Sequence, residues 1–521
     1  RDLRRELARA RALAEAVLNR LRQGRPGARL LRRSLPAARP GREGTSAPPV
    51  SAGHSLHPGA GARSARRGDR RGGARVVTRA ALALCLLALA APGAHAQDAV
   101  PEAPFKEGDV LGFEQVEKLR SYLPEQFWEH REFFFYEGMQ IEIGPKNRDY
   151  GESKVFEDAT ARWQKEAAIG RDGALVGYVA GRPFATEKID CKSDPQAALK
   201  IIWNFNKSWN GSGWKTSFFY SYWDRGEQLP LFYKGSSEGV ALSQRVEPQY
   251  VESRGDVFEK EKRLAGGGVT VTEPFDARGI MTLSYRYKAS DGPLDEARND
   301  DLWVYIPDLR RVRRISQAQR TDSIQGTDFT MDDLRSFSGV PPQYEWTCLE
   351  ERRLIHPTNA TRLGYPYRDD YNYGPYGFSY ANDRWELRDA FLVRFNPKNE
   401  DHPYHHKDIW IDKQTYQPLY SSAYDRKKEL WKLIWHNFRW TEDWLGKTPE
   451  TTDPLARDGV YNPPWEGVDE VRTLRLASQI IVNVQSGTGN RIEVWNNKGG
   501  PPPSKGEIRR LVDIGRLNKG R

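Results

Sequence analysis

The stretch that decides the fold covers residues 300–339 and reads DDLWVYIPDLRRVRRISQAQRTDSIQGTDFTMDDLRSFSG. Its β-branched and aromatic run at residues 302–306 ends in Pro-Asp, which is typical of a strand that enters a turn. A second short strand at residues 311–315 follows at hairpin distance. Further on, Thr330 with a carboxylate three residues later is typical of a helix start. The stretch therefore predicts a hairpin, a loop and a short helix.

Strand patterns continue on both sides of this stretch. Residues 281–288 alternate between apolar and polar side chains, which predicts a strand with one apolar face. Further strands are predicted at residues 407–412, 418–424, 430–440, 473–484 and 491–495, and helices at residues 113–135, 156–168 and 196–204 and after Ser504. The predicted fold class is therefore α+β: mainly antiparallel β, with one large curved sheet and helices packed on one face.

The charge of the chain is unevenly distributed. Residues 1–96 contain 20 Arg and five acidic residues, a net charge of +15, whereas the whole chain carries +10. The remaining 425 residues therefore carry −5. The high isoelectric point belongs to the first part of the chain and does not indicate nucleic acid or an anionic membrane as a partner.

Residues 76–96 predict a secretory signal peptide. Arginines precede an apolar run at residues 80–91, and Ala94-His95-Ala96 gives the A-x-A pattern for cleavage after Ala96. The run is too short to span a bilayer, and Cys85 follows Leu84, where a lipoprotein signal would need a small residue. The mature protein is therefore expected to be exported to the periplasm, without a lipid anchor.

The rest of the chain is divided by composition. Residues 1–75 are expected to lie upstream of the true start or to be disordered, and the alternative is a basic amphipathic helix. The mature chain is expected to contain three parts. Residues 97–260 form an N-terminal part with helices and strands, residues 261–446 a central β region, and residues 447–521 a C-terminal part with strands and a last helix.

Several motif blocks occur in order along the chain. They are Gly181-Arg182-Pro183-Phe184, Tyr305-Ile306-Pro307, Gly326-Thr327-Asp328-Phe329-Thr330, Asp332-Asp333-Leu334 and Ile409-Trp410-Ile411-Asp412-Lys413. In this order they resemble the secreted bacterial family named domain of unknown function 1329, within the LolA-like outer-membrane lipoprotein-sorting superfamily. The resemblance is best over residues 273–440. It implies a half-open β-barrel with helical lids over a hydrophobic cavity, and a partner such as an inner-membrane transporter or an outer-membrane protein.

A set of apolar and aromatic residues on the predicted strands could line such a cavity, because lipid carriers need apolar pockets with few polar groups. The candidates for ligand binding are Met281, Leu283, Tyr285, Trp303, Tyr305, Trp410, Trp431 and Trp435. The alternative is an ordinary filled core, and the sequence does not separate the two.

The strongest basic patch consists of Arg310, Arg311, Arg313 and Arg314. Guanidinium groups pair bidentately with phosphate and carboxylate, so the patch could contact a lipid headgroup, an acidic ligand or a partner protein. The alternative is that these side chains are solvated or pair with Asp300 and Asp301.

Catalytic and metal-binding patterns are weak. Ser237 lies in a G-x-S-x-G pattern, but the surrounding sheet is predicted to be antiparallel, so a polar loop is the favoured interpretation. His402, His405 and His406 could bind a metal with Asp401 or Asp408, yet a proline and a strand favour an exposed loop instead. The adjacent Asp332 and Asp333 are explained by helix capping.

Two cysteines remain in the mature chain, Cys191 and Cys348. In an oxidising compartment they could form a disulfide bond, and the alternative is two buried free thiols.

The sequence thus predicts a non-enzymatic periplasmic carrier of a lipid or another hydrophobic ligand, without a cofactor, a metal or a nucleic-acid partner. One alternative is a glycan or cell-wall-polymer binding protein with exposed aromatic residues, and another is a serine hydrolase based on Ser237.

Overall fold

The computed structural model describes residues 103–224, 229–247, 262–315, 320–361, 373–444, 472–498 and 505–518. The chain divides into two units, Arg1–Glu102 and Ala103–Arg521, and all described residues belong to the second. The predicted signal peptide and the segment before it lie outside the described residues. Within the described ranges, no helix is both long and apolar enough to cross a membrane.

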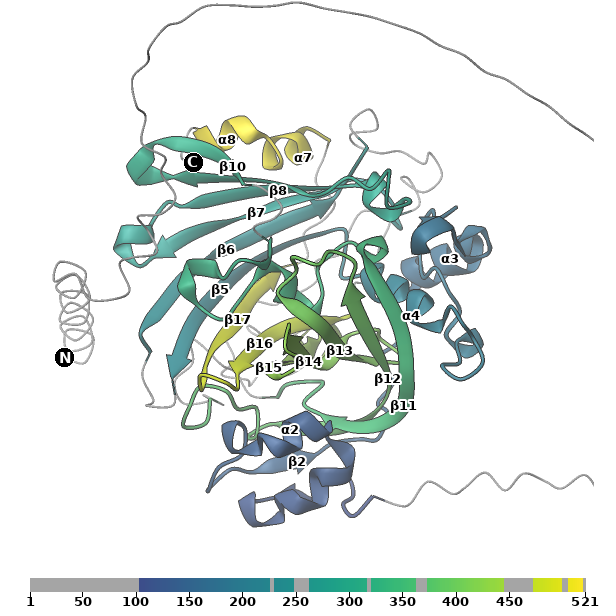
Figure 1. The fold of residues 1–521 in the computed structure, drawn as a ribbon, viewed down its shortest axis with the longest axis vertical. Coiled ribbons are helices and arrows are strands. Elements are labelled where there is room, and N and C mark those ends of the chain that lie inside the picture. Colours follow the sequence, from purple (N-terminus) through teal and green to yellow (C-terminus); the bar gives the residue numbers. More distant parts are fainter. Residues whose placement is uncertain are drawn as a thin grey trace, which may run out of the picture. The chain divides into compact units, whose positions relative to one another are not determined.

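The described residues build one 15-stranded sheet, shown in Figure 1. The strand order is β1-β2-β12-β13-β14-β15-β16-β17-β5-β6-β7-β8-β9-β10, and β11 pairs with β12 beside this path. Neighbouring strands are antiparallel, apart from β2, which is parallel to β12. The predicted antiparallel β class is confirmed, and the sheet is open rather than closed into a barrel.

The strands of this sheet are β1 (Val110–Leu111), β2 (Ile141–Ile143), β5 (Gly213–Asp224), β6 (Leu231–Ala241), β7 (Arg263–Glu273), β8 (Met281–Tyr287), β9 (Asp301–Ile306), β10 (Arg311–Ile315), β11 (Tyr344–His356), β12 (Arg384–Pro397), β13 (Tyr404–Asp412), β14 (Pro418–Asp425), β15 (Leu430–Trp440), β16 (Leu474–Asn483) and β17 (Thr488–Lys498). A separate pair consists of β3 (Ala168–Ile169) and β4 (Leu175–Val176).

The α-helices of the described residues are α2 (Glu125–Glu129), α3 (Lys154–Trp163), α4 (Ala197–Asn206), α7 (Lys505–Leu511) and α8 (Ile514–Asn518). The 3-10 helices are η1 (Phe113–Tyr122), η2 (Arg131–Phe133), η3 (Gln164–Glu166), η4 (Arg171–Gly173), η5 (Thr186–Lys188), η6 (Phe275–Ala277), η7 (Lys288–Asp291), η8 (Pro307–Leu309), η10 (Ile324–Gly326), η11 (Met331–Ser336), η12 (Pro341–Gln343) and η14 (Thr441–Trp444).

The stretch at residues 300–339 folds as a hairpin followed by a loop and a 3-10 helix. β9 and β10 are antiparallel, with Arg311 opposite Ile306. Proline at the start of η8 and a left-handed Arg310 with φ of +47° close the turn between them. The predicted short helix is the 3-10 helix η11, which is interrupted near its end where Arg335 takes a left-handed conformation with φ of +52°.

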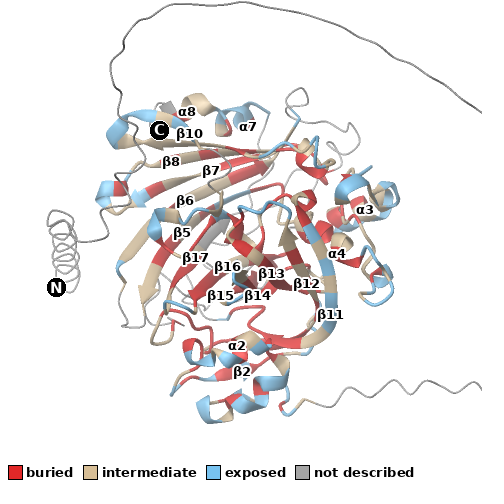
Figure 2. Cartoon of the chain, viewed as in Figure 1, coloured by how far each residue is buried: buried red, intermediate tan, exposed pale blue. Residues whose placement is uncertain are grey.

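The middle of the sheet is buried on both faces, as Figure 2 shows in red. One face of β12 and β13 contributes Ala390 and Trp410 to a core that includes Phe127 of α2. The opposite face contributes Phe391 and Ile409 to a second core with residues of α4. The prediction that helices cover one face is therefore wrong, because these central strands are apolar on both faces and each face needs cover.

Candidate functional site

The C-terminal helices α7 and α8 lie beside β8 and β10 in Figure 1, and their apolar side chains pack against residues of β8 and β9. Alternate residues of β8, namely Met281, Leu283 and Tyr285, are buried there. Across the strand pair, Met281 lies opposite Tyr305 and Leu283 opposite Trp303. The alternation predicted from the sequence is thus confirmed, and it places five of the eight candidate ligand-binding residues on one face.

Three apolar side chains of the helical segment fill this face: Ile508, Val512 and Leu517. We call residues 505–518 the C-terminal cover. A cavity of about 20 Å³ between the cover and β8 is lined by Met281, Leu283, Thr282, Leu511 and Leu517 among others. Because this volume holds little more than one water molecule, the face is filled rather than hollow in this structure.

Few polar contacts attach the C-terminal cover to the sheet. The Tyr285 hydroxyl donates a hydrogen bond to the carbonyl oxygen of Val512. Arg516 forms an ion pair with Glu238 of β6 at 2.5 Å. Gly266 of β7 allows the close approach, since a Cβ atom there would lie 2.7 Å from Cγ1 of Val512. The cover is therefore attached mainly by apolar contacts.

The other three candidate residues lie elsewhere. Trp410 and Trp435 are buried in the core that contains α2, and Trp435 packs against Phe134 with ring centroids 4.9 Å apart. Trp431 packs at the edge of the core on the opposite face. The structure thus distributes the eight predicted residues over three clusters, and only the five beneath the C-terminal cover share a surface.

All four arginines of the basic patch are exposed at the edge of the sheet. Arg314 pairs with Asp301, as one alternative expected, and its Cζ atom lies 5.9 Å from the ring centroid of Trp303. Asp300 pairs instead with Arg286 and Arg320. Contact of the patch with an anion or a partner stays a prediction.

Cys191 and Cys348 are joined by a disulfide bond, with Cα atoms 5.2 Å apart. Cys191 lies between η5 and α4, and Cys348 lies in β11. The bond therefore connects the segment before α4 to the strand against which this helix packs.

The three histidines do not converge on a metal site. His405 and His406 face each other through their Nδ1 atoms at 2.8 Å, and His406 stacks on Tyr424. His402 is buried, and its Nε2 atom lies 3.6 Å from Asp332 Oδ2. Among the described residues, no group of three His, Cys, Asp or Glu side chains is placed to hold a metal ion.

Ser237 lies within β6, where it pairs with Thr216 of β5 and Val269 of β7. The strand continues to Ala241, so the weak helical pattern after Gly239 does not form a helix directly behind the serine. The tight strand-to-helix turn that activates a serine in hydrolases is not formed at this position.

A buried ionic cluster connects η11 to the sheet, and the sequence analysis missed it. Asp333 accepts hydrogen bonds from Lys407 Nζ at 2.6 Å, Lys432 Nζ at 3.2 Å and the Tyr404 hydroxyl at 2.8 Å. Burial raises the pKa of Asp333, but the charges of the two lysines outweigh it and hold the pKa well below its ordinary value. The Thr330 hydroxyl also donates to the Asp333 carboxylate at 2.9 Å, but no side-chain hydrogen bond caps η11, so the interpretation of Asp333 as a helix-capping residue is wrong.

Asp332 belongs to a neighbouring network. It pairs with Arg320 at 2.8 Å, and Arg320 also pairs with Asp300 at 2.7 Å. Burial opposes ionisation of Asp332, but His402 and Arg320 outweigh this effect and lower its pKa to about 2. No sequence motif predicts either network. Lys407, Lys432 and Arg320 lie in ordinary strand or loop sequence and contact the aspartates only in the folded protein.

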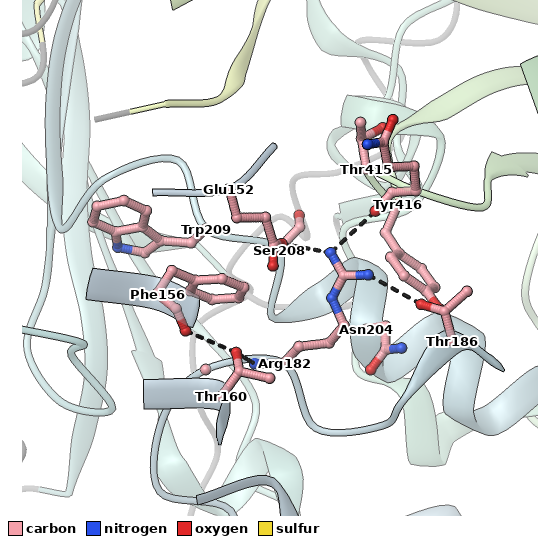
Figure 3. A network of polar contacts seen from close by, with 12 residues as sticks. Glu152, Phe156, Thr160, Arg182, Thr186, Asn204, Ser208, Trp209, Thr415 and Tyr416 are labelled. Atoms are coloured by element: carbon pink, nitrogen blue, oxygen red, sulfur yellow. Dashed lines mark hydrogen bonds and ion pairs between the residues drawn. The ribbon is translucent and has the colours of Figure 1, made fainter. Parts of the chain in front are cut away.

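Arg182 of the Gly-Arg-Pro-Phe block organises a third polar network, shown in Figure 3. Its guanidinium pairs with Glu152 at 2.5 Å and donates to Thr186 Oγ1 at 3.1 Å and to the carbonyl oxygen of Gln414 at 3.0 Å. Gly181 before it has φ of +81° and lies against the backbone of Thr160. The block thus attaches the loop before α4 to α3 and to the turn between β13 and β14.

Comparison with known protein families assigns the chain to one family. The model for the family described as "Protein of unknown function (DUF1329)" matches residues 114–453. Among curated proteins, the chain is 28% identical over 137 residues to the uncharacterized protein PA3922 of Pseudomonas aeruginosa. This match covers 25% of the chain and 30% of the relative, so the chain matches less than a third of that protein's length.

Solved structures with a similar fold include a DUF1329 family protein from Desulfovibrio piger, which is 15% identical with a TM-score of 0.39 over 62% of this chain and 100% of that chain. They also include the LolA superfamily protein NE2245 from Nitrosomonas europaea, which is 12% identical with a TM-score of 0.32 over 59% of this chain and 96% of that chain.

Proposed function

We propose that this protein, which belongs to the DUF1329 family of proteins of unknown function, is a non-enzymatic periplasmic carrier of a lipid-like ligand. One observation carries the proposal: a separate C-terminal helical segment covers a broad apolar and aromatic sheet face. The ligand would take the place of this cover. The predicted signal peptide and the motif blocks that resemble the lipoprotein-sorting superfamily support an exported carrier, which would exchange its ligand with a membrane partner.

The free energy that the cover gains by burying its apolar side chains is comparable to the free energy that an acyl chain would gain on the same face. Burying a side chain the size of Ile, Val or Leu contributes about 1.5–3 kcal/mol, so Ile508, Val512 and Leu517 together hold the cover with about 5–9 kcal/mol. An acyl chain contributes about 0.8 kcal/mol for each CH₂ group removed from water. A chain of about six to eleven CH₂ groups therefore offsets the loss of the cover.

The face beneath the cover suits an acyl chain. Met281, Leu283 and Trp303 provide apolar contact, and the hydroxyl of Tyr285 would lose its backbone partner on Val512 when the cover leaves. That hydroxyl would then be free to donate to a polar headgroup. A surface with few polar groups among apolar side chains is typical of sites that bind lipids.

A disulfide bond that locks the cover tests the proposal. A Cβ atom at Gly266 would lie 3.4 Å from Cβ of Val512, close to the spacing of about 3.5–4.5 Å in disulfides. The double variant Gly266→Cys/Val512→Cys should therefore close the cover when it is oxidised. We expect the oxidised variant not to bind dansyl-undecanoic acid or to carry lipid in native mass spectrometry, and the reduced variant to do both.

Wild-type protein under the same reducing conditions is the control, because the reductant also acts on Cys191–Cys348. Equal ligand binding by the oxidised and reduced double variant would show that the ligand site lies elsewhere. A clean apo mass of the wild type after incubation with lipid vesicles would contradict the carrier function itself.

The glycan-binding alternative receives less support from the structure. It requires a platform of exposed aromatic residues. Among the large apolar residues that are exposed in the described ranges, only Phe113, Trp214 and Phe275 are aromatic. These three belong to different elements, η1, β5 and η6.

A further inference from the structure

A second cavity, of about 30 Å³, lies among α3, the turn between β13 and β14, and the start of β16. Its lining is mixed: Glu152, Ser208, Thr415, Gln417 and Arg472 are among its polar residues, and Phe156, Trp209 and Trp440 are among its apolar ones. Figure 3 shows Glu152, Phe156, Ser208 and Trp209 gathered around this region. The volume corresponds to about two water molecules, which restricts an occupant to a group of a few heavy atoms.

Arg335 contacts the wall of this cavity. Its Nη2 atom donates hydrogen bonds to Ser208 Oγ at 3.2 Å and to Gln417 Oε1 at 2.9 Å, and both residues line the cavity. The guanidinium also lies over the ring of Phe205, with Cζ 5.1 Å from the centroid. The side chain is thus held in one place by two hydrogen bonds and one aromatic contact.

The backbone supports this position. Arg335 adopts a left-handed conformation with φ of +52°, and its N–H donates to Gln479 Oε1 of β16 at 2.9 Å. A non-glycine residue in this conformation stores backbone strain, and such residues are concentrated at functional sites. The strained turn directs a partly buried arginine toward Ser208 and Gln417 rather than into solvent.

The charges around the cavity do not balance. Arg472 pairs with Glu442 at 2.7 Å, and Arg182 pairs with Glu152 at 2.5 Å. Arg335 has no carboxylate partner among the described residues. Burial lowers its pKa to about 10, so the guanidinium keeps its charge at neutral pH. One positive charge is therefore left uncompensated behind the wall formed by Ser208 and Gln417, an arrangement that costs stability unless an anion completes it.

We propose that this cavity binds a small oxyanion, such as a phosphate or carboxylate group, with Arg335 as its charged anchor. Arginine suits this role because its planar fork can donate two parallel hydrogen bonds to such a group. The Nε2 atom of Gln417 has no partner among the described residues and can supply a further donor. The site is distinct from the face beneath the C-terminal cover and does not depend on the proposed carrier function.

The test uses thermal unfolding of the purified protein with increasing inorganic phosphate, acetate or dioctanoyl phosphatidic acid. A ligand that binds only the folded state raises the melting temperature with its concentration. We expect a rise of several degrees for the wild type with at least one of these probes, and none for Arg335→Gln. Arg426→Gln, which removes an exposed arginine between β14 and β15, is the matched control and should behave as the wild type does.

The three probes distinguish the sources of the anion. A response to inorganic phosphate or acetate indicates a free anion, and a response to phosphatidic acid alone indicates a lipid headgroup. An equal shift in the wild type and in Arg335→Gln, or no shift with any probe, would overturn the proposal.

A second variant keeps the test valid if Arg335→Gln does not fold. Ser208→Leu fills the cavity and leaves every charge in place. We expect this variant to unfold cooperatively without a response to the probes, and a wild-type response in it would equally overturn the proposal.

Discussion

Lys407 on β13 donates from Nζ to Asp333 Oδ1 at 2.6 Å, and neither side chain is exposed to solvent. Lys432 on β15 contacts the other carboxylate oxygen of Asp333 at 3.2 Å. A single carboxylate on a 3-10 helix thus pairs with lysines from two strands of the sheet. The contact attaches the loop that follows the β9–β10 hairpin to the centre of the fold.

Removal of this carboxylate should be strongly destabilising. Asp333→Ala leaves Lys407 and Lys432 buried without a charged partner, and we expect the free energy of unfolding to fall by about 3–5 kcal/mol. Urea denaturation followed by tryptophan fluorescence measures the change. The matched variant Asp158→Ala breaks an exposed ion pair with Lys154 and should change stability little. Similar losses of unfolding free energy in the two variants would contradict the prediction that the buried ion pairs matter more than the exposed one.

Asp332 should make stability depend on acid pH. Its pKa is about 2 in the folded protein and about 3.9 in an unfolded chain, so the unfolded state binds the proton more tightly. The stabilisation is therefore fully present above about pH 4 and is lost as the pH falls through about 2. The shift corresponds to about 2–3 kcal/mol. Between pH 5 and pH 2, the urea midpoint of Asp332→Asn should fall less steeply than the midpoint of the wild type. Parallel falls of the two midpoints with pH would argue against this linkage.

The disulfide bond should stabilise the fold through the length of the chain segment that it closes. Cys191 and Cys348 are 157 residues apart, and a loop of this length favours a stabilisation of about 2–5 kcal/mol. We expect Cys191→Ser/Cys348→Ser to lose this amount in urea denaturation. Dithiothreitol should lower the stability of the wild type to that of the double variant and leave the variant unchanged. A wild type that is insensitive to the reductant would contradict the prediction.

The C-terminal cover should open when its apolar contact is broken. Ile508→Asp places a carboxylate against the buried face of β8, so we expect the cover to detach and the fluorescence of an apolar dye such as anilinonaphthalene sulfonate to rise. The neighbouring variant Arg509→Asp changes an exposed residue and should not raise it. Near-ultraviolet circular dichroism should stay native in Arg509→Asp. In Ile508→Asp it should change only in part, because Trp303 lies beneath the cover whereas Trp385 and Trp435 belong to a different core. Equal dye binding by the two variants would count against a detachable cover.

Local patterns in the sequence predicted much of the fold. The alternation at residues 281–288 corresponds to β8 with every second residue buried, and the patterns at residues 418–424 and 430–440 correspond to β14 and β15. The prediction of β8 succeeded because one buried face imposes a period of two on a strand, whereas β14 and β15 are buried on both faces and were recognised by strand-forming residues between turn residues. The helix expected at residues 196–204 is α4, Ala197–Asn206.

The candidate site was less predictable. Trp410 and Trp303 look alike in sequence, but one is buried in the central core and the other lies beneath the C-terminal cover. Which face of a strand meets which helix depends on tertiary packing, and no local pattern encodes it. Arg335 could not have been recognised either, because its significance lies in the carboxylate that it lacks after folding.

The order of strands has a consequence for how the protein reaches its native state. β16 and β17 lie between β15 and β5, so the last strands of the chain join the first long strand to the central ones. Until residues 474–498 are present, β5 through β10 and β11 through β15 have no strand between them. Such pairing between distant segments is slow, and unpaired strand edges are prone to aggregate while it is incomplete. We therefore expect the sheet to assemble only after nearly the entire polypeptide has emerged, which suits the export that we propose for this protein.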